Sequence, residues 1–564
     1  MKKDNEYEAA ILYSPPTLRT NSFKRIAVGT TAVLLLLGLH GSYRTRGSLA
    51  GHFIYCTSGS VPKDYFDASA GTASIAVARF KATKSPQKGT VFLNPGGPGG
   101  SGTRLATQEV ADLIGHDWDL VQCFDSVMDF NFFTTNTVLQ QGFTVVSSAN
   151  LSNPALEAQL VEQSRQFLAL KKSQAELCAK NMGDELRYMG TATVVRDIDF
   201  MTKLFDGEDA KINFWGGSYG SILGAYIINM LPDRAGFVVI DGIVDPVNWS
   251  MEPSHKWPAN WLASTEKTYR FFLETCSRAG PEACPLTAEK DEPYESIQER
   301  LEVFFNKLAV APLPVPFAFR PGFLTSGAAR ALLLMYLERP PQWSDAATAF
   351  SQALAGNGTL LFNKLATPRP PSTPHYDLVR LGVTCLDSPP PKSRTDIPTP
   401  EDLVAEFIRT MEEVSPHFGA SVSVGEPDGG CQYWPVRGPE RFAGPWNASL
   451  EWPMLIVSNT MDPITPIESG LRINSLMRDS TRIIIQDGPG HCSTAIPTLC
   501  TMKLVRGYYA GELPENGTRC STSYDFFPDL LRKDADLVGL DKDDRRLLQS
   551  AHTVGMLLQE VRRA

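Results

Sequence analysis

The stretch INFWGGSYGSILGAYIINM, residues 212–230, decides the fold class. It begins with a short β-forming run, passes through a glycine-rich turn and continues with apolar residues at helical spacing. The turn GGSYG, residues 216–220, fits the pattern G-x-S-x-G. Between a strand and a helix, this pattern holds the serine hydroxyl exposed, and close packing leaves room only for glycine on either side. Ser218 is therefore a candidate nucleophile, with a plain glycine turn as the alternative.

Short apolar runs recur outward from this stretch in both directions. They predict strands at 72–80, 90–93, 120–124, 212–215, 237–240, 454–457 and 483–485. Helical spacing predicts helices at 155–180, 191–205 and 222–230. Strands that alternate with helices indicate an α/β protein with a mostly parallel central sheet covered on both faces.

The pattern changes along the chain and predicts six segments. Between the two halves of the core, Pro-rich stretches such as 388–391 interrupt helical ones over a length too great for a loop. Near the end, apolar residues at helical spacing from Leu547 to Val561 predict a helix packed on the body. The predicted segments are a disordered tail at 1–25, a signal anchor or signal peptide at 26–43, a first core part at 50–250, a largely helical cap at 251–440, a second core part at 441–540 and an amphipathic helix at 541–564.

Composition excludes several classes of protein. The chain has 564 residues, of which 43% are hydrophobic and 20% charged, as in ordinary globular proteins. The formal net charge is -9, and there is no basic block beyond the flanks of the apolar run near the N-terminus. These values predict no nucleic-acid partner. His and Cys are too scattered to give the spacing of metal ligands.

The run Ile26–Leu39 is apolar and uncharged, with Lys24 and Arg25 before it and Arg44 and Arg46 after it. It is shorter than the roughly 20 residues of a usual spanning helix. We interpret it as a retained single-pass signal anchor, with a cleaved signal peptide ending near residue 50 as the first alternative and a buried soluble helix as the second. The first two interpretations send the rest of the chain into the secretory pathway, either anchored to a membrane or secreted.

Two further features support export. N-x-S/T acceptor sites for glycosylation occur at Asn150, Asn248, Asn357, Asn447 and Asn516. Ten cysteines are compatible with disulfides in an oxidising compartment, although several could be buried free thiols. The pairs Cys276/Cys284 and Cys500/Cys520 each bracket a short segment, which favours local disulfides.

A serine needs a base within hydrogen-bond reach. Of the eight histidines, His491 follows a predicted strand on a glycine-rich loop, which is where the base of this fold belongs. Asp462 lies on the loop after strand 454–457 and would orient the base and stabilise its charged form. Along the chain the three residues follow in the order Ser, Asp, His, which is the order expected when the nucleophile lies on a strand-to-helix turn of this kind. Asp487, on the same loop as the histidine, is the competing acid.

A glycine-rich loop, NPGGPGGSG at 94–102, follows an early predicted strand and precedes a helix. Its glycines let the backbone approach a substrate, so that N–H groups can meet the negative charge of a tetrahedral intermediate. Gly97 (or Gly96) and Tyr219 are the predicted oxyanion-hole donors. The alternative, a phosphate-binding loop, lacks both G-K-S/T and G-x-G-x-x-G with an acidic partner.

Taken together, the motifs NPGGPGGSG, GGSYGSILGAY, VIDGIVDPVNW, SNTMDPITP and GPGHCS resemble the proline iminopeptidase/tripeptidyl aminopeptidase group of α/β-hydrolases, peptidase family S33. Residues 452–520 resemble the TAP-like C-terminal segment of that group. The resemblance implies an α/β-hydrolase fold and a serine exopeptidase that releases N-terminal residues or short peptides, with Ser218, Asp462 and His491 at the triad positions. Residues 124–133 depart from the Asp-x-Arg-Gly-x-Gly loop usual in the group.

The sequence is also compatible with other functions. The same triad would serve a hydrolase of esters, amides or lactones of a small metabolite. A catalytically inactive binding module on the same fold is a third hypothesis, which the complete triad disfavours. The chemistry needs no cofactor, and the expected partner is a peptide or small acyl substrate. An exopeptidase would also need a carboxylate for the substrate ammonium, and Glu252 is one of several cap candidates.

Overall fold

The computed structural model describes residues 54–100, 102–123, 151–365, 376–420, 429–527 and 539–561. The chain divides into two units, residues 1–42 and 43–564, and every described residue belongs to the second. The predicted tail, the apolar run, Asn150 and the loop at 124–133 lie outside the described residues. In the described part of the chain, no helix is long and apolar enough to cross a membrane.

A nine-stranded sheet forms the centre of the second unit, with strand order β1-β2-β4-β3-β5-β6-β9-β10-β11. Only β2 runs antiparallel to its neighbours, and the other adjacent pairs are parallel. The predicted strands are confirmed, whereas β1 and the polar β11 were not predicted from the sequence. The strands are β1 (Ile54–Pro62), β2 (Thr72–Phe80), β3 (Gly89–Asn94), β4 (Trp118–Cys123), β5 (Ile212–Ser218), β6 (Ala235–Ile243), β9 (Met454–Met461), β10 (Thr481–Pro489) and β11 (Thr518–Ser521).

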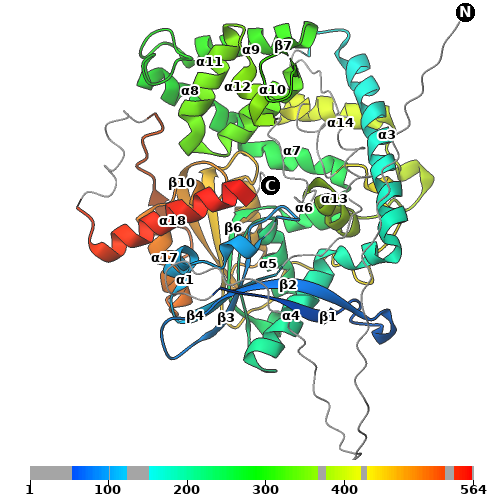
Figure 1. Cartoon of the computed structure of the whole chain (residues 1–564), viewed down its shortest axis with the longest axis vertical. Coiled ribbons are helices and arrows are strands. Elements are labelled where there is room, and N and C mark those ends of the chain that lie inside the picture. Colours follow the sequence, from blue (N-terminus) through cyan, green and yellow to red (C-terminus); the bar gives the residue numbers. More distant parts are fainter. Residues whose placement is uncertain are drawn as a thin grey trace, which may run out of the picture. The chain divides into compact units, whose positions relative to one another are not determined.

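Helices cover both faces of this sheet (Figure 1). In β3, Val91 and Leu93 pack into one apolar cluster and Phe92 into the other, because successive side chains of a strand point to opposite faces. One face carries α1 (Gln108–Ile114), α17 (Leu499–Tyr509) and α18 (Lys542–Val561). The other carries α4 (Thr191–Asp206), α5 (Tyr219–Met230) and α16 (Ile467–Leu476). Because both faces of these strands are buried, their sequences are continuous runs of apolar residues.

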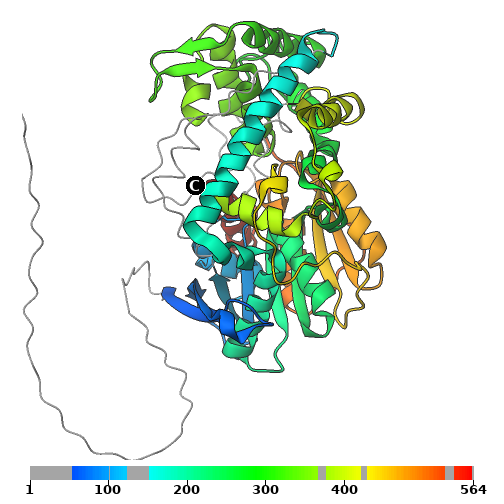
Figure 2. The ribbon, with the colours of Figure 1, turned by 90° about the vertical axis from the view of Figure 1, so that its right-hand side faces the viewer.

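A helical layer, most of whose helices share an apolar cluster of their own, stands beyond the carboxyl ends of the parallel strands (Figures 1 and 2). It also holds a short hairpin of β7 (Leu313–Val315) and β8 (Gly322–Leu324). We call this layer the cap. Its helices are α7 (Trp257–Trp261), α8 (Thr265–Ala279), α9 (Tyr294–Val310), α10 (Ser326–Leu337), α11 (Trp343–Leu354), α12 (Thr359–Leu365), α13 (Tyr376–Asp387) and α14 (Pro400–Glu413).

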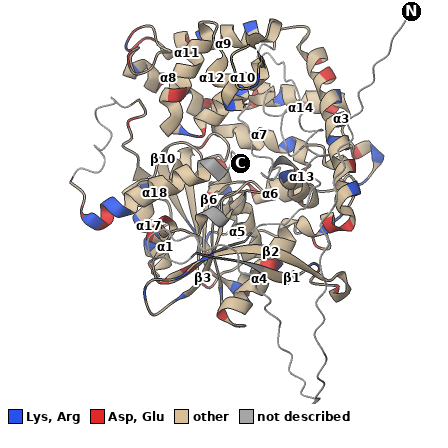
Figure 3. Cartoon of the chain, in the orientation of Figure 1, with Lys and Arg blue, Asp and Glu red and all other residues tan. Residues whose placement is uncertain are grey.

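One long helix from the first half of the chain joins the cap. The helix α3 (Leu156–Met182) has 27 residues and packs its apolar side, including Leu160 and Phe167, against α14. At about 1.5 Å per residue such a helix is roughly 40 Å long. Basic and acidic residues both occur at several places along this helix (Figure 3). The cap is therefore built from two separate stretches of sequence.

Three disulfides tie the described chain. The two local disulfides predicted from the sequence, Cys276–Cys284 and Cys500–Cys520, are confirmed. A third, Cys385–Cys431, joins α13 to residues beyond α14 and was not predicted. Its partners are 46 residues apart, so sequence proximity gave no signal for this pair.

Candidate active site

Ser218 occupies the turn between β5 and α5 and is half-buried, with φ 59° and ψ −123°. A residue other than glycine rarely takes this conformation, which costs on the order of 1–3 kcal/mol and recurs at functional sites. A Cβ added at Gly216 would lie 2.6 Å from the carbonyl oxygen of Gly220, and one at Gly220 would lie 2.8 Å from that of Asn94. The predicted requirement for glycine on both sides of the turn is confirmed.

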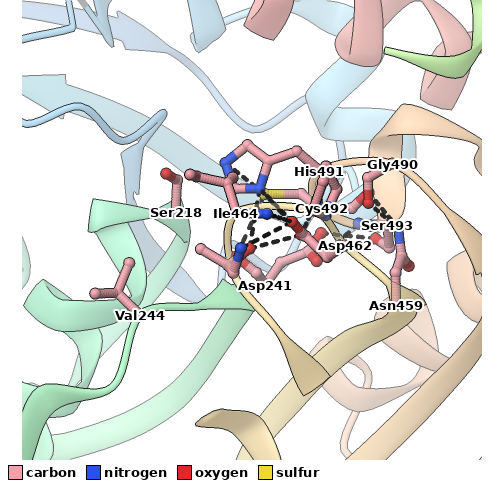
Figure 4. Close-up of polar contacts among 12 residues, drawn as sticks. Ser218, Asp241, Val244, Asn459, Asp462, Ile464, Gly490, His491, Cys492 and Ser493 are labelled. Carbon is pink, nitrogen blue, oxygen red and sulfur yellow. Dashed lines mark hydrogen bonds and ion pairs between the residues drawn. The ribbon is translucent and has the colours of Figure 1, made fainter. Parts of the chain in front are cut away.

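His491 and Asp462 meet through a short hydrogen bond. Nδ1 of His491 lies 3.0 Å from Oδ2 of Asp462 and 3.2 Å from Oδ1. Both side chains are buried, at the carboxyl ends of adjacent strands β9 and β10. Figure 4 shows Ser218 and Asp462 on opposite sides of the imidazole. Residues far apart in the sequence thus come together at the carboxyl ends of the strands.

The segments that carry Ser218 and His491 lie in contact. A Cβ on Gly217 would meet Sγ of Cys492 at 3.5 Å, so the residues next to the serine and next to the histidine touch. Within the described chain, the Ser218 hydroxyl and His491 do not form a hydrogen bond. In enzymes without substrate such bonds are often long and shorten only in the substrate complex.

The carboxylate of Asp462 accepts hydrogen bonds from several donors in addition to His491. The backbone N–H groups of Ile464 and Thr465 donate to Oδ1, at 3.1 and 2.9 Å, and Cys492 N–H donates to Oδ2 at 2.9 Å. Burial raises the pKa of Asp462, but the charge of His491 and these hydrogen bonds outweigh burial and hold the pKa below its ordinary value. Asp462 therefore stays ionised although it is fully buried.

Thr465 is a site residue that the sequence analysis missed. Its hydroxyl donates to Oδ2 of Asp462 at 2.6 Å and lies 2.9 Å from Nδ1 of His491. Because its single proton is used on the carboxylate, the hydroxyl oxygen can accept from Nδ1–H. This arrangement fixes the tautomer in which Nε2 carries no proton and can accept one. The spacing Asp-x-x-Thr, typical of a turn closed by an aspartate side chain, was the available signal.

The competing acid, Asp487, has a different partner. Its carboxylate binds the guanidinium of Arg519, whose Nε lies 3.0 Å from Oδ2. This ion pair is partly exposed at the edge of the sheet, between β10 and β11. The geometry therefore favours Asp462 over Asp487 as the partner of His491.

The glycine-rich loop after β3 lies directly against the nucleophile. A Cβ on Gly96 would stand 2.7 Å from Cβ of Ser218 and 3.3 Å from its Oγ, and the φ of Gly96 is 101°. The N–H of Gly96 already donates to Oδ1 of Asn94 at 2.8 Å. Tyr219, the other predicted donor, lies in the first turn of α5, where backbone N–H groups have no acceptor within the helix. Of the two glycines considered, Gly97 is therefore the better candidate.

The loop that carries His491 is fixed along its whole length. Four consecutive backbone N–H groups, from Gly490 to Ser493, donate to three segments of the protein, over 2.8–3.1 Å. In chain order the acceptors are Met461 O, Glu338 O, Asp462 Oδ2 and Asp241 Oδ1. The side-chain amide of Asn459 holds the carbonyls of Gly490 and Cys492, both at 2.8 Å. The position of the imidazole is therefore set by the core and, through Glu338, by the cap.

A buried carboxylate also supports the serine side of the site. Asp387, at the end of α13 in the cap, accepts from Thr191 N–H at 3.0 Å and from Trp249 Nε1 at 2.9 Å. The Thr191 hydroxyl lies 2.6 Å from the hydroxyl of Tyr219, the residue after the nucleophile. Burial raises the pKa of Asp387 to about 6 despite these hydrogen bonds. The cap thus reaches both the serine turn and the histidine loop.

A surface cleft of about 650 Å³ lies at the opposite edge of the sheet, near the starts of β3, β4, β5 and β6. Trp118, Phe237 and Trp452 contribute to its lining. It is remote from Ser218, because the serine stands at the carboxyl end of β5. This cleft is not part of the candidate active site.

The strand order, with an early antiparallel β2, a serine after β5, an acid after β9 and a histidine after β10, defines an α/β-hydrolase fold. Residues 415–520 match the family model described as TAP-like protein. The chain is a serine hydrolase of this fold.

Curated relatives make the relationship more specific. Serine protease Hip1 of Mycobacterium tuberculosis is 26% identical over 483 residues, which cover 82% of this chain and 87% of that protein. Tripeptidyl aminopeptidase of Streptomyces lividans is 25% identical over 487 residues, 81% of each chain. Carboxylesterase B of M. tuberculosis is 26% identical over 492 residues, 83% of this chain and 86% of that protein. The protein is therefore an α/β-hydrolase with a TAP-like segment at 415–520, related to Hip1 and to the Streptomyces tripeptidyl aminopeptidases.

Proposed function

We propose that the protein is an exopeptidase that releases N-terminal residues or short peptides through an acyl-enzyme on Ser218. The observation that carries this proposal is the buried contact of His491 with Asp462, 3.0 Å long, on a loop that touches the serine turn. Two relatives are described as a serine protease and a tripeptidyl aminopeptidase, which supports a peptide as the substrate.

In the proposed mechanism, Oγ of Ser218 attacks the carbonyl carbon of the scissile bond while its proton passes to Nε2 of His491. The N–H groups of Gly97 and Tyr219 stabilise the oxyanion. The C–N bond then breaks, the leaving amine takes the proton, and an ester on Ser218 remains. Water attacks this ester with His491 again as base, which releases the acid and restores the serine hydroxyl.

Asp462 has a supporting role in this proposal. Its carboxylate stabilises the imidazolium that forms in each half of the reaction and does not itself take the proton. The low pKa of this carboxyl supports the role, because the anion persists beside the charged ring.

Hydrolysis of an ester, amide or lactone of a small metabolite is the second candidate function. The relative described as carboxylesterase B supports it, and its similarity to this chain is comparable to that of the two peptidases. The same serine, histidine and aspartate would carry out both reactions.

A substrate panel separates the two functions. Purified protein is assayed on tripeptidyl and aminoacyl arylamides, on the same compounds with an acetylated N-terminus, and on simple aryl esters. An exopeptidase cleaves the free-amine arylamides and loses most of this activity on acetylation. Turnover of esters alone contradicts the peptidase proposal, and any turnover by Ser218→Ala similar to that of the wild type contradicts the assignment of the nucleophile.

We also propose that the chain enters the secretory pathway and is held at a membrane by residues 26–43. The three disulfides support an oxidising compartment. Asn357 and Asn447 are exposed, as a glycosylation site requires. Asn516 is also exposed, and its amide oxygen accepts from Ile483 N–H at 2.9 Å, whereas Asn248 is half-buried in α6 (Pro246–Met251).

Expression of the full chain in eukaryotic cells tests the location. The expected product pellets with membranes, resists extraction by alkaline carbonate and shifts to lower mass when its N-glycans are removed. The substitutions Asn357→Gln, Asn447→Gln and Asn516→Gln, made singly, identify the glycosylated sites by the part of the mass shift that each removes. An unglycosylated product in the cytosol would contradict the proposal, and a soluble secreted product with a new N-terminus would indicate a cleaved signal peptide.

A further inference from the structure

A second carboxylate stands beside the catalytic carboxylate. Asp241 lies at the carboxyl end of β6, 2% exposed, between the strand that leads to Ser218 and the strand that leads to Asp462. In the sheet it is paired with Gly217 of β5 on one side and with Val457 of β9 on the other. Its position therefore connects the two strands whose ends carry the nucleophile and the acid.

Both side-chain oxygens of Asp241 are bound by Ser493, two residues after His491. Oδ1 accepts the backbone N–H of Ser493 at 2.8 Å, and Oδ2 accepts its hydroxyl at 2.6 Å. The backbone oxygen of Asp241 lies 3.5 Å from the thiol of Cys492. The carboxylate thus binds the histidine loop from the sheet, whereas Glu338 of the cap accepts the N–H of His491.

The charged groups that act on Asp241 are Asp462 and His491 of the candidate active site. Burial raises the pKa of Asp241 to about 6, the hydrogen bonds of Ser493 lower it, the charge of Asp462 raises it and that of His491 lowers it. The facing titratable groups are Asp462 at the end of β9, and His491 with the thiol of Cys492 on the loop after β10. A charge on Asp241 therefore acts on the same imidazole as the charge on Asp462.

We propose that Asp241 is a positioning residue for the hydrolytic reaction, which holds His491 in place through Ser493 and adds a second negative charge that stabilises the imidazolium. This inference rests on the proposed roles of Ser218 and His491. Asp241 does not touch the reacting atoms. It acts through the loop and through the electrostatic field at the ring.

Loss of this charge has a predictable sign. A nearby negative charge favours the imidazolium and raises the pKa of the imidazole, so removal of the charge lowers that pKa. The acid limb of the pH–rate profile, which reports loss of the proton from the base, then moves to lower pH. The maximal rate falls because the imidazolium formed in the transition state is less stable. Misfolding alone would lower the rate without moving the limb.

The test follows the second-order rate at which a fluorophosphonate probe labels Ser218, from pH 4 to pH 9. In this reaction the P–F bond breaks, an O–P bond forms on Ser218, fluoride leaves and His491 takes the proton. Asp241→Asn is expected to lower the rate at neutral pH by about 10- to 100-fold and to move the acid limb to lower pH. If the acid limb of the Asp241→Asn profile lies at the same pH as that of the wild type, and the labelling rate is within threefold of the wild-type rate, the proposal is overturned.

Asp245→Asn is the matched control. Asp245 lies on the same segment, is buried, accepts two backbone N–H groups at the start of α6 and pairs with Arg472, but does not bind the histidine loop. This variant should label within threefold of the wild-type rate, with an unmoved acid limb. Equal losses in both variants, in proportion to their folded fraction, would overturn a specific role for Asp241.

If Asp241→Asn does not fold, Ser493→Ala decides the question, because it removes one hydrogen bond and keeps the carboxylate. The expected labelling rate is about 3- to 10-fold below the wild type. An unchanged rate would overturn the proposal. Failure of the proposed function is distinguishable, since the wild-type protein would then not be labelled, or Ser218→Ala would be labelled as well.

Discussion

The imidazole of His491 owes its orientation to two side-chain acceptors on one loop. Nδ1 lies 3.0 Å from the carboxylate of Asp462 and 2.9 Å from the hydroxyl of Thr465. Because both acceptors are buried, water cannot readily replace either of them. Loss of one acceptor leaves a buried N–H less well satisfied, which costs on the order of 1–3 kcal/mol.

Thr465→Val tests this arrangement with a side chain of nearly the same shape. We expect the labelling rate of Ser218 by a fluorophosphonate to fall about 10- to 100-fold, because the tautomer and orientation of the base are less well fixed. Thr268→Val is the control, since its hydroxyl binds the carbonyl of Met461 at 2.9 Å and not the triad. A rate for Thr465→Val within twofold of the control would contradict the role of Thr465.

At the scale of the elements, the turn between β5 and α5 depends on close backbone packing. Gly220 lies in the first turn of α5, against the end of β3, and a Cβ there would lie 2.8 Å from the carbonyl oxygen of Asn94. A backbone atom cannot move aside as a flexible side chain can, so the helix itself would have to shift. Such a shift would carry the serine with it.

Gly220→Ala is expected to lower the free energy of unfolding by about 1–3 kcal/mol and to reduce the labelling of Ser218. The measurement is thermal unfolding followed beside the labelling assay. Gly59→Ala in β1 is the matched control, because a Cβ there has only Val77 at 3.7 Å, an ordinary contact, and should leave both values nearly unchanged. Equal effects of the two substitutions would show that steric contact at Gly220 is not the cause.

In the cap, His417 binds Glu266 of α8 with Nδ1 2.7 Å from the carboxylate. Burial lowers the pKa of His417, but the hydrogen bond and charge of Glu266 outweigh burial and raise that pKa above 6.5. Burial raises the pKa of Glu266, but its bonds with His417 and Ser415 outweigh burial and hold that pKa below 4.5. The raised histidine pKa gives stability that is lost as pH rises through it, and the lowered Glu266 pKa gives stability that is lost as pH falls through it.

His417→Gln should therefore destabilise the protein most near pH 5.5 and progressively less as the pH rises above the histidine pKa. Melting temperatures at pH 5.5 and pH 8.5 measure the difference. A double-mutant cycle with Glu266→Gln isolates the pair, and a larger coupling at the lower pH is expected. A loss of stability that is equal at the two pH values would contradict a charged pair.

At the scale of the whole molecule, the cap and the core share the active site. The carbonyl of Glu338, just after α10, accepts His491 N–H at 2.9 Å. On the core side of α8, the hydroxyl of Thr265 donates to the carbonyl of Pro463 at 2.6 Å. Asp387 of α13 supports Tyr219 through Thr191. A change in the position of the cap would therefore alter contacts at, or next to, each of the three candidate triad residues.

The Cys385–Cys431 disulfide fixes α13, and with it Asp387, to the segment that returns to the core. Replacement of both cysteines with alanine should lower the free energy of unfolding by about 3–4 kcal/mol, since the bridge closes a long loop. The melting temperature of this variant, against that of the Cys276→Ala/Cys284→Ala variant with its separation of 8 residues, is the measurement. An unchanged melting temperature for the long-range pair would contradict a stabilising role.

The sequence by itself determined the fold class and was sufficient to nominate Ser218, Asp462 and His491 as the candidate site residues. Continuous apolar strands, a serine between two glycines and a histidine on a loop after a late strand are local patterns, each set by backbone geometry over a few residues. Thr465 was within reach of the same local reasoning, because its spacing from Asp462 is that of a side-chain-closed turn.

Only the tertiary structure decided which buried groups surround the histidine. Asp241 and Ser493 are 252 residues apart, and Asp387 meets Thr191 across 196 residues. Such contacts depend on strand order and on how the cap folds back, which no local pattern of residue types encodes. The preference for Asp462 over Asp487 has the same basis: Asp462 is the more distant carboxylate in the sequence, 29 residues from His491, yet it contacts the imidazole, whereas Asp487 pairs with Arg519.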